Sequence, residues 1–199
     1  MDSPQFADPK GGGELLVIFE DGNAPHKRET KIGLLLGKAG LVTVAFPMYN
    51  EKRSSPLALR VLNGVDLLGS TEIICDVRAL AVKALQEKAP TIAVRQVLRT
   101  IGKVAAAAQM KKQAGELGQL AGLVWNYVSE SADLRSWLTL PADVQIFRIK
   151  LPAGKYQLAL QHPMAAHSVN TEVTIGDGGK SMIQVVRVGG ELYRSVMQF

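Results

Sequence analysis

The spacing of apolar residues changes twice along this chain, and that change constrains the fold more than any other feature. Short apolar runs separated by Gly, Pro and Asn-Gly turn signals come first, at residues 14–20, 29–36, 40–49 and 56–64. Over 92–108 the apolar side chains are instead three and four residues apart, as on one face of a helix. Strand-like alternation then returns, in runs at 144–151, 154–162, 170–175, 180–188 and 191–198.

This order predicts an α+β fold. We expect an antiparallel, β-sandwich-like sheet built from N- and C-terminal strands, with a helical insert over about 76–131. Residues 1–13 are rich in Pro and Gly and predict a flexible tail or linker. Residues 14–199 are then a single domain, with strands over 14–75, the insert over 76–131 and strands over 144–198. The segment Pro152-Ala153-Gly154 predicts a hairpin turn between two of the later strands.

The helical insert has recognisable signals at its start and inside it. Asp76 is a predicted N-cap, and Pro90 is a residue that opens a second helix. Gly115, Gly118 and Gly122 interrupt the apolar face. Residues 90–130 therefore form either one long helix or a helical hairpin broken near Gly115.

A basic stripe lies beside the apolar seam of this insert. Arg95, Arg99 and Lys103 are four residues apart, with Lys111 and Lys112 beyond them. These five residues are the candidate interaction surface, and an anionic membrane is one partner that they predict. Nucleic acid is not expected, because the stripe has no interleaved aromatic residues. Packing of the apolar face on the sheet is the default expectation for so regular a helix.

The sequence offers little for catalysis. Glu20, Asp21 and His26 form a candidate polar loop, which more often is simply solvated. His162 and His167 lie five residues apart without further ligands at zinc spacing, so we expect no metal and no cofactor.

Trp137 lies where helical spacing gives way to strand spacing, in "ADLRSWLTLP". Pro141 stops any helix before the next strand. We expect Trp137 to be a buried structural anchor that locks the insert against the sheet. If so, Trp137→Ala would cost about 3–5 kcal/mol of stability.

Three segments carry a family resemblance: "GELLVIFEDGNAPHKRETKI", "VTVAFPMY" and above all "ADLRSWLTLPADVQIFRIKLPAGKYQL". They resemble the C-terminal domain of a group of uncharacterised bacterial envelope lipoproteins, over most of residues 13–165. In that group a lipidated cysteine and a tetratricopeptide-like helical region come first. Neither pattern occurs in these 199 residues, so we expect a fragment of a longer exported protein or a short variant.

The resemblance implies a non-enzymatic protein of the periplasm, anchored to the outer membrane in its full-length form. Its expected role is a scaffold or partner-binding domain, with an envelope protein or a second copy as partner. One alternative is association with an anionic membrane through residues 90–130. Another is a cell-wall hydrolase that acts through Glu20, Asp21 and His26.

Overall fold

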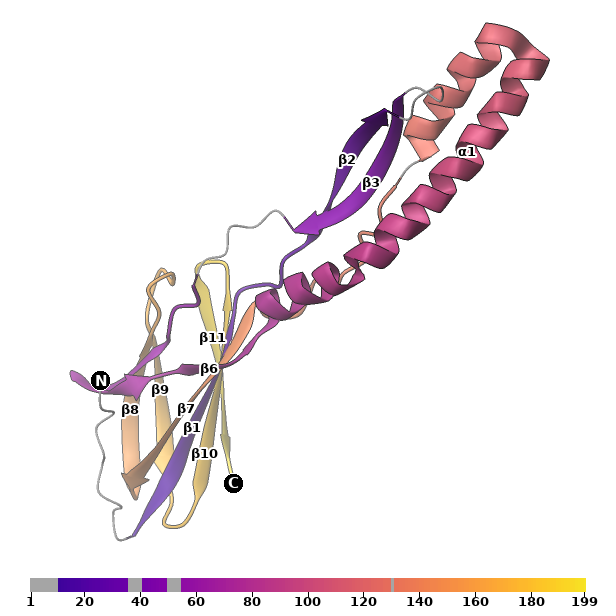
Figure 1. Cartoon of the computed structure of the whole chain (residues 1–199). Coiled ribbons are helices and arrows are strands. Elements are labelled where there is room, and N and C mark those ends of the chain that lie inside the picture. Colours follow the sequence, from indigo (N-terminus) through magenta and orange to yellow (C-terminus); the bar gives the residue numbers. More distant parts are fainter. Residues whose placement is uncertain (1–10, 36–40, 50–54, 130) are drawn as a thin grey trace. The chain divides into compact units, whose positions relative to one another are not determined.

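The computed structural model describes residues 11–35, 41–49, 55–129 and 131–199. Its contacts divide the chain into two compact units (Figure 1). The first, here called the sandwich unit, comprises Met1–Ala24, Arg53–Ala79 and Leu138–Phe199. The second, here called the helical unit, comprises Pro25–Lys52 and Leu80–Trp137. The sequence predicts one domain over 14–199, whereas the contacts divide the chain into two units.

The sandwich unit contains a five-stranded sheet in the order β11-β10-β1-β7-β6. Its strands are β1 (Gly12–Asp21), β6 (Glu72–Asp76), β7 (Asp143–Pro152), β10 (Lys180–Val188) and β11 (Glu191–Gln198). The central strand β1 pairs in parallel with β10 and antiparallel with β7. N- and C-terminal segments therefore share one sheet, as predicted.

A second, four-stranded sheet has the order β5-β4-β8-β9. Its strands are β4 (Arg60–Asn63), β5 (Asp66–Ser70), β8 (Gly154–Gln161) and β9 (Val169–Ile175). The predicted Asn63-Gly64 turn joins β4 to β5, and Gly64 has the positive φ of 61° that favours glycine.

The core of the sandwich unit takes apolar side chains from both sheets. Alternate residues of β1 are buried, which places Leu15, Val17 and Phe19 on its inner face. Leu158 and Leu160 of β8 join the same cluster from the other sheet. The observed architecture is the predicted α+β, sandwich-like fold.

The predicted hairpin at Pro152–Gly154 is wrong. β7 pairs with β1 and β6, whereas β8 pairs with β4 and β9, so the chain passes here from one sheet to the other. Ile149 and Leu151 of β7 lie in the same core cluster as Leu158 of β8. Two strands joined across different sheets show the same alternation of apolar residues as two strands of a hairpin. The alternation therefore did not distinguish the two arrangements.

The strands β2 (Lys27–Leu35) and β3 (Leu41–Tyr49) form a two-stranded sheet of their own in the helical unit. The prediction that they join the sandwich is therefore wrong. Apolar alternation shows that a strand is present, but it does not show which sheet the strand enters.

The helix α1 (Val77–Ser129) is the helical insert. Asp76 caps it as predicted, because its Oδ1 accepts a hydrogen bond of 2.9 Å from the Ala79 backbone N–H. The backbone leaves helical geometry at Gly115, with φ 64° and ψ −146°, and α1 turns back on itself as a helical hairpin (Figure 1). Pro90 lies inside the first arm, so the prediction that it opens a separate helix is wrong. A proline removes one helical hydrogen bond, and here the helix continues past that loss.

Candidate functional site

The first arm of α1 turns a polar side toward its own β-hairpin. Gln96 is 6 % exposed and Thr100, one helical turn later, is 4 % exposed. The Gln96 Nε2 donates a hydrogen bond of 2.9 Å to the Ala45 carbonyl of β3. Ala45 and its neighbour Val44 are themselves buried. The contact that holds the helix to β3 thus includes a side-chain amide.

The apolar residues of this arm lie on another side and remain in solvent. Val94, Val97, Leu98 and Ile101 are 54–63 % exposed, and their spacing puts them on one continuous face. We call these four residues the apolar stripe. An amphipathic helix normally buries such a face. The expectation that it packs on the sheet is therefore wrong, because β3 is contacted by the side that carries Gln96.

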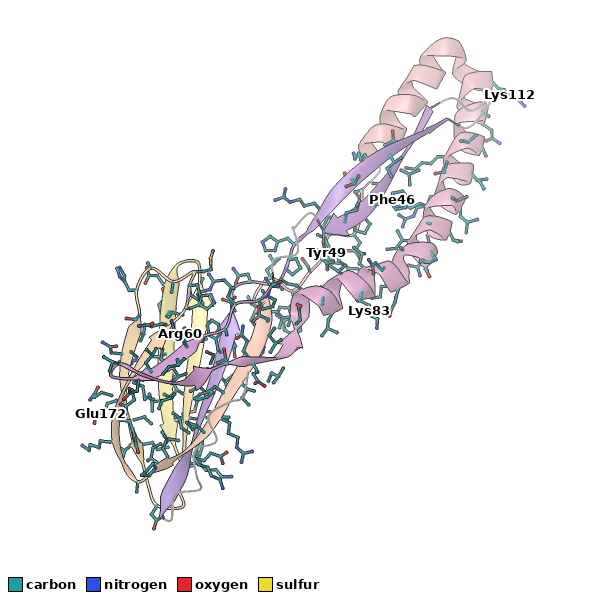
Figure 2. The ribbon with its side chains drawn as sticks, turned by 60° about the vertical axis from the view of Figure 1, so that its left-hand side comes forward. Phe46, Tyr49, Arg60, Lys83, Lys112 and Glu172 are labelled. Atoms are coloured by element: carbon teal, nitrogen blue, oxygen red, sulfur yellow. The ribbon has the colours of Figure 1, made fainter. Side chains whose placement is uncertain are left out.

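The predicted basic residues flank this stripe. Arg95 and Arg99 are exposed, each following a stripe residue in the chain, while Lys103 is half-buried. Lys112 is exposed where the first arm ends (Figure 2). The side chain of Lys111 lies outside the described residues. The structure thus places Arg95, Arg99 and Lys112 on the surface beside or beyond the stripe.

Charge is concentrated in the same arm. Residues 80–112, the part of this arm in the helical unit, contain seven Lys or Arg and one Glu, a net charge of +6. The whole chain carries +5, so the remaining residues together carry −1. Because charges of one sign add their fields over a surface, this arm attracts anions.

Trp137 is 73 % exposed, so the prediction of a buried anchor is wrong. It lies in residues 131–137, which form neither a helix nor a strand. Without a regular element to fix its direction, the indole is not held against an apolar face. The segment is attached to β2 through its backbone, since Glu29 Oε2 accepts a 2.7 Å hydrogen bond from the Ala132 N–H.

The predicted polar loop does not form one site. Glu20 and Asp21 are consecutive residues of β1 and therefore point to opposite faces of the sheet. Asp21 is buried and paired with Arg187, whereas Glu20 accepts a hydrogen bond of 3.0 Å from Gln184 Nε2. His26 is exposed and belongs to the helical unit.

The sandwich unit contains a buried polar network that was not predicted from the sequence. Asp143 and Gln145 of β7 are both fully buried. Asp143 accepts hydrogen bonds from Arg78 Nη2 at 2.6 Å and from Gln145 Nε2 at 2.7 Å. Gln145 Oε1 accepts one of 2.5 Å from the Thr71 hydroxyl. Burial raises the pKa of the Asp143 carboxyl above its usual range. A sequence signal existed, because 143 and 145 are in phase with the inward residues of β7.

His162 is buried near this network. Its Nδ1 accepts a 3.2 Å hydrogen bond from the Met164 N–H, so its Nε2 carries the proton and donates to the Leu57 carbonyl at 3.1 Å. The Phe19 ring lies 5.2 Å away between centroids. Burial lowers the pKa of His162, which keeps the imidazole neutral at pH 7. Both ring nitrogens are engaged with backbone, as in a structural histidine.

An open pocket of about 410 Å³ lies on the other side of the same five-stranded sheet. Leu16 and Met182 line it together with Glu14, Arg148 and Lys180, and none of the network residues does. Glu14 is ion-paired with Arg148. Among the residues that the structure describes, no cluster of three His, Cys, Asp or Glu is placed to hold a metal ion.

No protein-family model, curated protein or solved structure matches this chain.

Proposed function

We propose that this chain is a non-enzymatic scaffold or partner-binding domain of the periplasm, belonging to a lipoprotein anchored in the outer membrane. The apolar stripe of α1 is the observation that carries the binding role, since its own unit leaves it in water. The resemblance of residues 13–165 to envelope lipoproteins supports the compartment.

The hydrogen bonds of the buried polar side chains favour a binding role over catalysis. In the sandwich unit Gln145 donates a hydrogen bond to Asp143 and accepts one from Thr71, and both nitrogens of His162 bond to backbone. A catalytic acid or base must instead be aimed at a substrate. The stripe residues, by contrast, are 54–63 % exposed, so a partner that covers one completely gains about 1–2 kcal/mol from the part still in water. We do not propose the hydrolase, because Glu20 and Asp21 point to opposite faces of β1.

Fractionation of cells that express the full-length gene product tests the compartment. We expect the protein in the membrane fraction, released by detergent, and digested by a protease only after the outer membrane is opened. Recovery in the cytosol, with no protein in the envelope fractions, would refute the proposal. A cytosolic reporter and a known periplasmic enzyme in the same cells are the controls.

A further inference from the structure

We infer that the partner of the apolar stripe is the surface of an anionic lipid bilayer, on which the first arm of α1 lies flat. This inference rests on the proposed binding role of the stripe and names its partner. Its grounds are the exposed apolar face, the cations beside it and the charge of the arm that carries both.

The stripe has the geometry of an interfacial helix. Val94, Val97, Leu98 and Ile101 follow one another at three- and four-residue spacing, over about 10 Å of helix. Leu80 is also exposed on the same side nearer the start of the helix, with Glu87 between it and the stripe. A helix of this kind sinks its apolar face into the boundary between headgroups and acyl chains, with its axis parallel to the membrane.

The charges complement the lipid rather than a neutral surface. Arg95 and Arg99 stand in solvent beside the stripe, where a helix lying flat brings them to the level of lipid phosphates. The arm holds seven cations and one anion over 80–112. Within the described residues, no helix is long and apolar enough to cross a bilayer.

A second copy of the chain is a poorer partner. Stripe-to-stripe packing would bring two arms of net charge +6 together, and like charges at short range repel. Nucleic acid would use the arginines but leave the four stripe residues in water. A protein partner usually requires aromatic or Arg anchors that fit pockets, whereas the stripe consists of Val, Leu and Ile side chains, which a fluid lipid surface covers without shape matching.

Co-sedimentation of the full chain with vesicles tests the inference. The probe is phosphatidylcholine with about 30 % phosphatidylglycerol, compared with pure phosphatidylcholine. We expect binding to the anionic vesicles at about 0.01 M salt, and weaker binding at about 1 M salt, where the Debye length falls from about 30 Å to about 3 Å. Binding independent of lipid charge, or absent at low salt, would overturn the inference.

Two double variants distinguish the apolar contribution to vesicle binding from the electrostatic one. Leu98→Gln with Ile101→Gln removes apolar contact, and Arg95→Gln with Arg99→Gln removes charge. Each pair is expected to weaken vesicle binding about tenfold or more. Val65→Gln and Arg60→Gln are the matched controls, since both residues are exposed on the sandwich unit and should leave binding unchanged.

Other partners give different results. If light scattering shows a dimer that Leu98→Gln with Ile101→Gln abolishes, the partner of the stripe is a second copy of the chain and not lipid. Nucleic-acid binding lost only in the arginine pair, without vesicle binding, would also overturn the inference. If Leu98→Gln with Ile101→Gln loses the helical circular dichroism signal, Val97→Thr is tested in its place, because threonine keeps the shape of valine. Failure with vesicles leaves the periplasmic location standing, and fractionation decides that separately.

Discussion

Leu98→Gln is expected to leave the free energy of unfolding of the helical unit almost unchanged. Leu98 is 63 % exposed, so roughly a third of its side chain is covered. Complete burial of a leucine side chain is worth about 1.5–3 kcal/mol, which gives about 0.5–1 kcal/mol for the covered part. Glutamine keeps an aliphatic stem and has nearly the helix propensity of leucine. The expected loss is therefore below about 1 kcal/mol.

Val44→Ala is the matched variant on the buried side of the same unit. Val44 is 3 % exposed, and the change removes two buried carbon atoms. At about 0.8 kcal/mol per carbon, with a further cost for the cavity, the loss should be about 1.5–2.5 kcal/mol. The two variants thus test whether the helix keeps its apolar or its polar side toward β3.

Urea denaturation followed by far-ultraviolet circular dichroism measures both variants, because α1 dominates that signal. The slope of the transition should be the same for each, so that the midpoints report stability alone. If Leu98→Gln costs as much as Val44→Ala, the stripe is covered in solution and the reasoning fails. A loss that grows with protein concentration would identify a second copy as the cover.

Gly13→Ala should destabilise the sandwich unit by about 1–3 kcal/mol, because its Cβ would lie 2.4 Å from the Gly176 carbonyl oxygen, a backbone atom; an unchanged urea midpoint would contradict this. Thermal stability should fall as the pH drops from about 7 toward 5, because the unfolded chain protonates His162 near pH 6.5 while burial holds its folded pKa lower. In His162→Gln this contribution to the pH dependence of thermal stability should vanish. An unaltered pH dependence would mean that another group causes it. Trp137→Ala should change the unfolding free energy by less than about 0.5 kcal/mol, since the side chain is 73 % exposed; a loss of about 3–5 kcal/mol would restore the anchor.

Local alternation was enough to predict most strands, and it was not enough to predict their partners. The predicted run 144–151 is β7 without one residue at each end, and 180–188 is β10. The pairing of β1 with β10 and the crossing at Pro152–Gly154 depend on contacts between segments far apart in sequence. The alternation of a strand is the same whichever neighbour it finds, so a single sequence carries no record of that choice.

The polar network shows a second limit. Gln145 falls on the same face of its strand as Phe147 and Ile149, which the alternation predicts. Whether a polar residue there is buried depends on a partner such as Thr71, which lies on a different segment and donates to Gln145 Oε1. A buried amide without a partner would cost about 1–3 kcal/mol. The residue pattern therefore located the position, and the hydrogen bond that makes its burial tolerable was visible only in three dimensions.

The contact of α1 with β3 follows the same rule for one carbonyl, although Gln96 Oε1 is itself buried without a hydrogen-bond partner among the described residues. A two-stranded sheet leaves backbone groups unpaired along its outer edges, and any element that covers such an edge must supply hydrogen-bond partners. The Gln96 amide does so for the Ala45 carbonyl, and the side chains of Val94 or Leu98 could not. Helical periodicity locates the apolar face of α1, whereas the hydrogen-bonding needs of β3 favour the polar side as its neighbour. An arm held by its polar side keeps its apolar side for a surface outside its own unit, and the basic residues beside the stripe favour an anionic one.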